Sequence, residues 1–135
     1  MWNILTRLLA LCALIFLLAS RALSAEPTET RIALVVGNAA YQAGPLQTAA
    51  NDAGLIAQTL QAAAFDVIGA RDLDQEGLRR AFRDFLDKAS ASGPDTVAVI
   101  YLSGYALQLE GENYFLPIDA KIARDTDVIA EGVAA

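Results

Sequence analysis

The side chains that could do chemistry here are carboxylates and hydroxyls, because the 135 residues include no histidine and a single cysteine, Cys12. Without histidine there is no imidazole base and no imidazole metal ligand. The carboxylates near the ends of predicted strands are Asp52, Asp72, Asp74 and Asp119. Two of them could serve a hydrolase, or a divalent cation could bridge them, although helix capping or dipole complementation is the simpler explanation of Asp52 and Asp74.

Two turns that contain glycine follow the most hydrophobic segments of the chain: Gly37-Asn38 and Ser103-Gly104-Tyr105. In an open parallel sheet, ligands gather at the carboxyl ends of the strands, where the winding reverses. Both turns are expected at that crevice. The candidate residues of such a cleft are Asn38, Asp52, Ser103, Gly104 and Tyr105. The alternative is that each glycine only permits a tight turn.

The elements that must position these turns alternate along the chain. Short apolar runs predict strands over 31–37, 65–68 and 96–102, with Gly69 closing the second. Apolar residues at helical spacing predict a helix over 49–63, capped by Thr48 or Asn51, and another that Asp74 caps. The second helix has the apolar stripe Leu78, Phe82, Phe85 and Ala89, and the charge pairs Arg80–Asp84, Arg83–Asp87 and Asp84–Lys88 on its outer face.

This alternation predicts an α/β fold with right-handed crossovers, in which a parallel sheet has the strand order 2-1-3. Beyond the third strand, the segments 105–109 and 114–117 flank a four-residue turn at 110–113 and predict a small β-hairpin. A further helix is expected near Asp127.

The N-terminus has the layout of a secretory signal peptide: an unbroken apolar run over 8–19 follows Arg7 and precedes a stretch of small residues. We therefore divide the chain into a signal peptide (1–24), a polar lead (25–30) and one domain (31–135), and expect export to the periplasm or the extracellular space. A retained signal anchor is the alternative, and only that uncleaved segment would contact a membrane. Without residues 1–24 the chain contains no cysteine and has a net charge of −8, which argues against nucleic acids and phosphate ligands.

Several motifs together resemble a known family. The run Arg31–Asn38 with Tyr41, then Asn51-Asp52-Ala53, resembles the opening of bacterial caspase-like and metacaspase domains. In that family the third strand ends in Tyr-x-x-Gly-His-Gly, and a short hairpin with Asn-Tyr and Leu-x-Pro follows. Here residues 101–106 read Tyr-Leu-Ser-Gly-Tyr-Ala, and Asn113-Tyr114 and Leu116-Pro117 follow. The resemblance extends from residue 31 to about residue 135.

The resemblance implies a three-layer αβα caspase-like fold and a cysteine endopeptidase domain, of which this chain would be the N-terminal portion, ending before the fourth strand. The family's catalytic histidine falls on Tyr105, the glycine after it falls on Ala106, and the nucleophilic cysteine belongs to the fourth strand. A tyrosine, whose pKa is ordinarily about 10, holds no positive charge that would favour a thiolate and is a poor proton acceptor at neutral pH. We therefore predict an inactive domain, either a truncated remnant or a pseudopeptidase that binds a peptide or a partner protein, with no cofactor and no metal.

Two alternatives remain open on sequence alone. One is a small hydrolase that uses carboxylates, with or without a metal, around Asp52, Ser103 and Asp119. The other is an interaction module: the third strand would be an exposed apolar sheet edge that accepts a strand from a partner or from a second copy in a homodimer.

Overall fold

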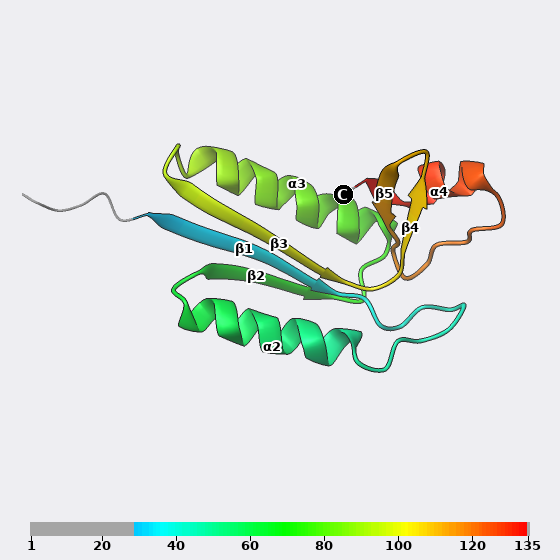
Figure 1. The fold of residues 1–135 in the computed structure, drawn as a ribbon, viewed down its shortest axis with the longest axis horizontal. Coiled ribbons are helices and arrows are strands. Elements are labelled where there is room, and N and C mark those ends of the chain that lie inside the picture. Colours follow the sequence, from blue (N-terminus) through cyan, green and yellow to red (C-terminus); the bar gives the residue numbers. More distant parts are fainter. Residues whose placement is uncertain (1–28, 135) are drawn as a thin grey trace, which may run out of the picture.

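The computed structural model describes residues 29–134. They form a parallel sheet with one long helix on each face, and a smaller sheet and a short helix lie beside them (Figure 1). The elements are, in chain order, β1 (Thr30–Gly37), α2 (Ala49–Ala62), β2 (Asp66–Arg71), α3 (Gln75–Ala91), β3 (Thr96–Ser103), β4 (Ala106–Leu109), β5 (Glu112–Phe115), α4 (Asp125–Glu131) and β6 (Val133–Ala134).

The main sheet has the order β2-β1-β3, and both pairings are parallel. The predicted α/β class and the strand order 2-1-3 are therefore confirmed. In the register of the sheet, Gly37 lies opposite Arg71 on one side and Ser103 on the other. The three strands consequently end at the same level, which is the level at which the sequence places its two glycine-bearing turns.

The core forms around the central strand, β1, in which every residue from Ile32 to Gly37 is buried. Side chains alternate between the two faces of a strand, so every second residue points to the same layer. Ile32, Leu34 and Val36 pack with Leu78 and Phe85 of α3. A strand with a helix on each face is buried on both sides, and its continuous apolar run follows from that position.

The second strand is longer than predicted, because Gly69 does not close it. Pairing with β1 continues through Val36↔Ala70 and Gly37↔Arg71. A glycine weakens a strand, but the hydrogen bonds to a fully formed neighbouring strand hold the backbone extended. The connection to α3 therefore begins at Asp72.

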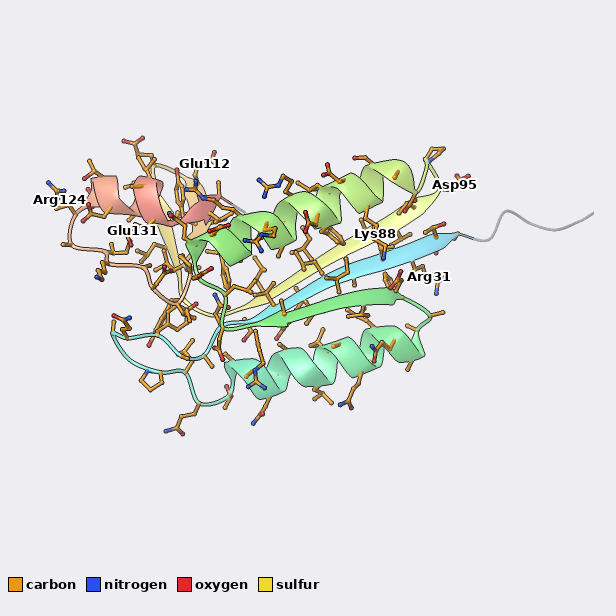
Figure 2. The ribbon with its side chains drawn as sticks, turned by 180° about the vertical axis from the view of Figure 1, so that it is seen from behind. Arg31, Lys88, Asp95, Glu112, Arg124 and Glu131 are labelled. Atoms are coloured by element: carbon orange, nitrogen blue, oxygen red, sulfur yellow. The ribbon has the colours of Figure 1, made fainter. Side chains whose placement is uncertain are left out.

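The helix after β2 begins as predicted: Asp74 is its N-cap, and the Asp74 carboxylate accepts a hydrogen bond of 2.8 Å from the Gly77 N–H. The predicted charge pairs within this helix are wrong. Arg80 pairs with Glu76 at 2.6 Å, one turn toward the N-terminus. Lys88 lies beside the sheet and pairs with Asp66 of β2, also at 2.6 Å (Figure 2). The reason is that Lys88, in the last turns of α3, lies near the start of β2, and Asp66 at that strand end is its partner.

The hairpin β4–β5 has a tighter turn than predicted. Glu110 and Gly111 both have positive φ angles, 52° and 88°, and Glu112 already pairs with Leu109. Two residues with positive φ make the turn that matches the twist of the flanking strands. The expected four-residue turn is therefore wrong. The short strand β6, which the sequence did not predict, pairs with β5 and completes a second sheet of order β4-β5-β6.

The expected helix near Asp127 is present as α4. The predicted signal peptide and most of the polar lead lie outside the described residues. Within the described part of the chain, no helix combines the length and apolar character that crossing a bilayer demands.

Candidate functional site

The carboxyl ends of β1 and β3 lie side by side, and the turns that follow them are joined directly. The Asn38 backbone N–H donates a hydrogen bond of 2.8 Å to the Ser103 carbonyl. The Gly37-Asn38 and Ser103-Gly104-Tyr105 turns thus meet at the edge of the sheet, at which the ligand crevice of an open parallel sheet is expected.

Asn38 is completely buried beneath this crevice. Its side-chain oxygen accepts a hydrogen bond of 2.9 Å from the Leu73 N–H, and its amide nitrogen donates to the carbonyls of Leu73 at 3.4 Å and Leu116 at 3.2 Å. A buried backbone group needs such a partner, since water cannot reach it. Asn38 therefore connects three loops and has no polar atom left for a ligand.

Tyr41, in the loop after β1, contacts both the backbone and the ring of Tyr105. The Tyr41 hydroxyl donates to the Leu116 carbonyl at 2.9 Å and accepts a hydrogen bond from the Tyr105 backbone N–H at 3.0 Å. Burial of the Tyr41 side chain disfavours the phenolate and raises its pKa above the ordinary value of a tyrosine. The two rings lie 4.7 Å apart at an angle of 57°. Tyr41 belongs to the family motif, but its residue type and position alone did not identify it as a site residue.

Tyr105 itself is 40% exposed, although its backbone is held at both ends. Its N–H is bonded to Tyr41, and its carbonyl accepts a hydrogen bond of 2.9 Å from the Leu116 N–H. The backbone of Tyr105 is therefore held in place, while the residue remains partly exposed at the surface. Gly44 lies close to it: a methyl group added at Gly44 would come to 3.7 Å from the Tyr105 hydroxyl.

Gly104 is required by packing. A Cβ atom at this position would collide with the Tyr41 hydroxyl and would lie 2.8 Å from the Phe115 ring. Those distances are shorter than any stable contact between such atoms. The glycine thus lets β3 pass close to the tyrosine and to the hairpin, which the sequence could not reveal.

The candidate carboxylates mostly bind backbone groups. Asp72, whose φ is 52°, accepts hydrogen bonds from the N–H groups of Ala39 at 2.8 Å and Ala40 at 2.9 Å. These two bonds favour the ionised form and lower the pKa of Asp72. Asp119 accepts from the Gln75 N–H at 3.1 Å, at the start of α3.

Asp52 is exposed in the first turn of α2, where a negative charge complements the helix dipole. Ser103 is partly exposed at the end of β3. Among residues 29–134, no three acidic or cysteine side chains come together in a way that would hold a metal ion. The carboxylates named for a hydrolase thus lie in different elements: Asp52 is in the first turn of α2, and Asp119 binds the start of α3.

The strand order and the two covering helices define an α/β protein with a parallel sheet, whose switch point lies between β1 and β3. Residues 30–131 match the family model of the caspase domain. The chain therefore belongs to the caspase domain family of peptidases. A search of curated proteins finds no match.

Proposed function

We propose that this caspase-family domain is a pseudopeptidase: it does not hydrolyse peptides and binds a peptide or a partner protein at the crevice beside Tyr105. Tyr105 carries this proposal, because it occupies the position that the family resemblance gives to the catalytic histidine. Cysteine-peptidase chemistry needs an imidazole that favours the thiolate and then protonates the leaving amine. A phenol has no cationic form that could do the first of these tasks.

The surroundings of Tyr105 support binding. Its ring is exposed, its backbone N–H and carbonyl are both fixed by hydrogen bonds, and the Tyr41 ring packs against it. Tyrosine is enriched at protein interfaces because it offers a large apolar face and a polar end. A backbone that is already held by hydrogen bonds loses little conformational freedom on binding.

Activity is tested with the full chain and libraries of fluorogenic peptides. We expect no turnover, and none after Tyr105→His, because restoring the imidazole supplies no thiolate: the sequence has one cysteine, Cys12, and it belongs to the predicted signal peptide. Turnover that persists with inhibitors of contaminating proteases and disappears in Ser103→Ala or Asp52→Asn would contradict the proposal and favour the hydrolase alternative.

Binding is tested by screening an array of synthetic peptides and measuring the strongest binders by fluorescence anisotropy. Tyr105→Ala is expected to weaken them about tenfold or more, the usual effect of removing a central aromatic contact. Leu107→Ala is the matched control, because Leu107 has the same exposure, 40%, but lies in the hairpin. Equal affinities of wild type and Tyr105→Ala would contradict a role for this crevice.

The outer edge of β3 supports a second candidate, an interaction module that forms homodimers. Val97 and Ile100 are 37% and 41% exposed, and no strand within residues 29–134 pairs with this edge. Unpaired backbone groups beside apolar side chains are a template for another strand. Sedimentation of the full chain tests this candidate: a dimer that Val99→Pro dissociates would favour it, and a monomer at every concentration would reject it.

We also propose that residues 1–24 direct export and are removed near Ser24 or Ala25. Mass spectrometry of the protein recovered from the periplasm or the medium tests this. A mature N-terminus at that point is the expected result, and an intact N-terminus in the membrane fraction would indicate a retained anchor instead.

A further inference from the structure

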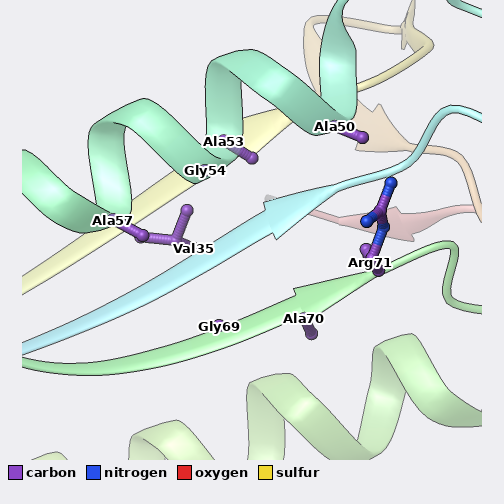
Figure 3. Close-up of a pocket in the computed structure, with 8 residues that line it drawn as sticks. All are labelled: Val35, Ala50, Ala53, Gly54, Ala57, Gly69, Ala70 and Arg71. Carbon is purple, nitrogen blue, oxygen red and sulfur yellow. The ribbon is translucent and has the colours of Figure 1, made fainter.

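A groove opens between α2 and the outer edge of β2, on the side of the sheet opposite to β3 (Figure 3). Its volume is about 310 Å³. The groove is lined by Ala50, Gly54 and Ala57 of α2, by Val35 of β1, and by Gly69 and Arg71 of β2. The size is at the lower end of ligand pockets, and the lining is that of such pockets: mostly apolar, with one charged group.

Two glycines keep this groove open, and nothing else in their surroundings requires them. A Cβ atom at Gly54 or at Gly69 would meet no atom within 4 Å, and neither residue has a positive φ. Gly37 is the contrast, because a Cβ there would lie 2.7 Å from the Cβ of Ala53. Glycine inside a helix or a strand costs roughly 0.5–1 kcal/mol relative to alanine. A strand glycine without a packing role is typical of a place where another backbone or a ligand approaches.

The edge of β2 adds backbone groups to this groove. β2 is a terminal strand of the sheet, with β1 as its neighbour on one side. Gly69 and Arg71 are two residues apart, so their side-chain positions lie on the same face of the strand. In Figure 3 the Arg71 side chain extends toward α2 and ends near Ala50. In a strand added at this edge, every second side chain would face the groove. One of these side chains would lie next to Gly69, and the one two residues along would lie next to Arg71.

The charge of Arg71 is accessible to such a strand. Its side chain is 72% exposed, and its one ion-pair contact within the described residues, from Nε to Oδ2 of Asp72, is long at 3.9 Å. A solvent-exposed contact of that length competes weakly with a carboxylate that binds the guanidinium group directly. A guanidinium group forms its strongest hydrogen bonds with a carboxylate, which it can bind with two parallel N–H donors.

We propose that this groove binds an extended, acidic peptide segment of a partner protein, which pairs with the free edge of β2. An aliphatic side chain of the peptide fills the space between Gly69 and α2. An aspartate or glutamate two residues along the peptide pairs with Arg71. Strand addition obtains affinity from the backbone and specificity from alternate side chains, and this edge offers both. A fatty acid has an apolar chain and a carboxylate as well, but it cannot use the strand edge, which favours the peptide.

The test uses the full chain and fluorescein-labelled hexapeptides of two kinds, measured by fluorescence anisotropy. Peptides of the first kind carry Leu and Glu two residues apart among threonines, and one is made with Leu first and another with Glu first. Peptides of the second kind have Lys in place of Glu. We expect the first to bind about tenfold more tightly than the second. Arg71→Glu is expected to reverse this preference, and Arg83→Glu, an exposed arginine on α3, is expected to leave it unchanged.

Gly69→Val tests the groove itself by filling it. The added side chain meets no atom within 4 Å of its first carbon, so the thermal melt is expected to stay cooperative while peptide binding is lost. Ala98→Val adds the same kind of bulk on β3, at the other edge, and is expected to bind as the wild type does. Tyr105→Ala is also expected to bind normally, which separates this proposal from the proposed function.

Three results would overturn the proposal. The first is no saturable binding of either peptide by the wild-type chain. The second is binding that Gly69→Val and Arg71→Glu leave intact. The third is displacement of the peptide by dodecanoate at comparable affinity together with direct binding of dodecanoate, which would assign the groove to a lipid.

Discussion

The junction of loops at the carboxyl ends of β1 and β3 differs sharply from the outer edge of β3, although one strand belongs to both. At the junction, the polar groups of Asn38, Tyr41 and Asp72 are each bonded to backbone groups of other loops. At the edge, Val97 and Ile100 are exposed, and no strand within residues 29–134 forms hydrogen bonds with the backbone groups beside them. The junction is complete within the described residues, whereas the edge has the properties of a surface that another strand covers.

This difference separates the residues that build the site from the residue that would do its chemistry. Asn38, Tyr41 and Gly104 fix the loops by buried hydrogen bonds and close packing. Tyr105 only occupies the resulting position, and its exposed ring is not needed to hold the loops. A substitution at Tyr105 can therefore change the chemistry of the domain while its architecture persists.

The largest effect is expected from Asn38→Ala, which attacks the junction at its most buried point. The substitution leaves the buried Leu73 N–H without its partner and removes one of the two hydrogen bonds that the Leu73 and Leu116 carbonyls each accept. An unsatisfied buried group costs about 1–3 kcal/mol, so with the two further bonds lost we expect the free energy of unfolding to fall by roughly 3 kcal/mol in urea titrations. Asn113→Ala, in the exposed hairpin, is the control and is expected to change it by less than about 0.5 kcal/mol. Equal losses in the two variants would refute the role given to Asn38.

Gly104→Ala is expected to have the next largest effect, because one methyl group must fit against the Tyr41 hydroxyl and the Phe115 ring. Overpacking of this kind costs about 1–3 kcal/mol. Gly69→Ala is the matched control, since its Cβ meets open space, and it is expected to leave stability unchanged or slightly raised. Thermal melts of both variants check this contrast, and similar melting temperatures would contradict the packing role given to Gly104.

A smaller effect is expected in acid, through Asp72. Its pKa is lowered in the folded state by the N–H groups of Ala39 and Ala40, so the ionised carboxylate stabilises the fold above its unfolded pKa of about 4. That contribution is lost as the pH falls through the lowered value. Asp72→Asn keeps the positive φ accessible but removes the charge, so its stability should depend less on pH below about 4. Urea titrations at several pH values check this, and parallel curves for the two proteins would contradict it.

The smallest change in stability is expected at the edge, from Ile100→Lys. The side chain is already 41% exposed, so the free energy of unfolding should change by less than about 0.5 kcal/mol. A charge on an edge strand opposes pairing with another strand. Sedimentation should therefore show less self-association than in the wild type, and Leu55→Lys, at an exposed site on α2, should show no such loss. A large loss of stability would mean that the edge is part of the core.

Much of the fold could be predicted from periodicity because the main elements carry strong local signals. The apolar run of β1, the stripe of α3 and the Asp74 cap each identify an element without knowledge of its neighbours. The end of β2 and the turn at Glu110-Gly111 could not be predicted in the same way. Pairing with β1 carries β2 past its glycine, and the two-residue turn depends on φ angles that the hairpin register selects.

By itself, the sequence determined the alternation of strands and helices, the family motifs, and the replacement at Tyr105, since each of these is a property of residue types and their order. Only the tertiary structure decided which polar groups are free. From the sequence, Asn38 is a candidate cleft residue. In the structure it is fully buried, and its side chain is hydrogen-bonded to loops 35 and 78 residues away. Gly69 reads as the end of a strand, yet it faces an open groove. The physical reason is that burial and hydrogen-bond partnership depend on residues distant in the chain, which local patterns do not contain.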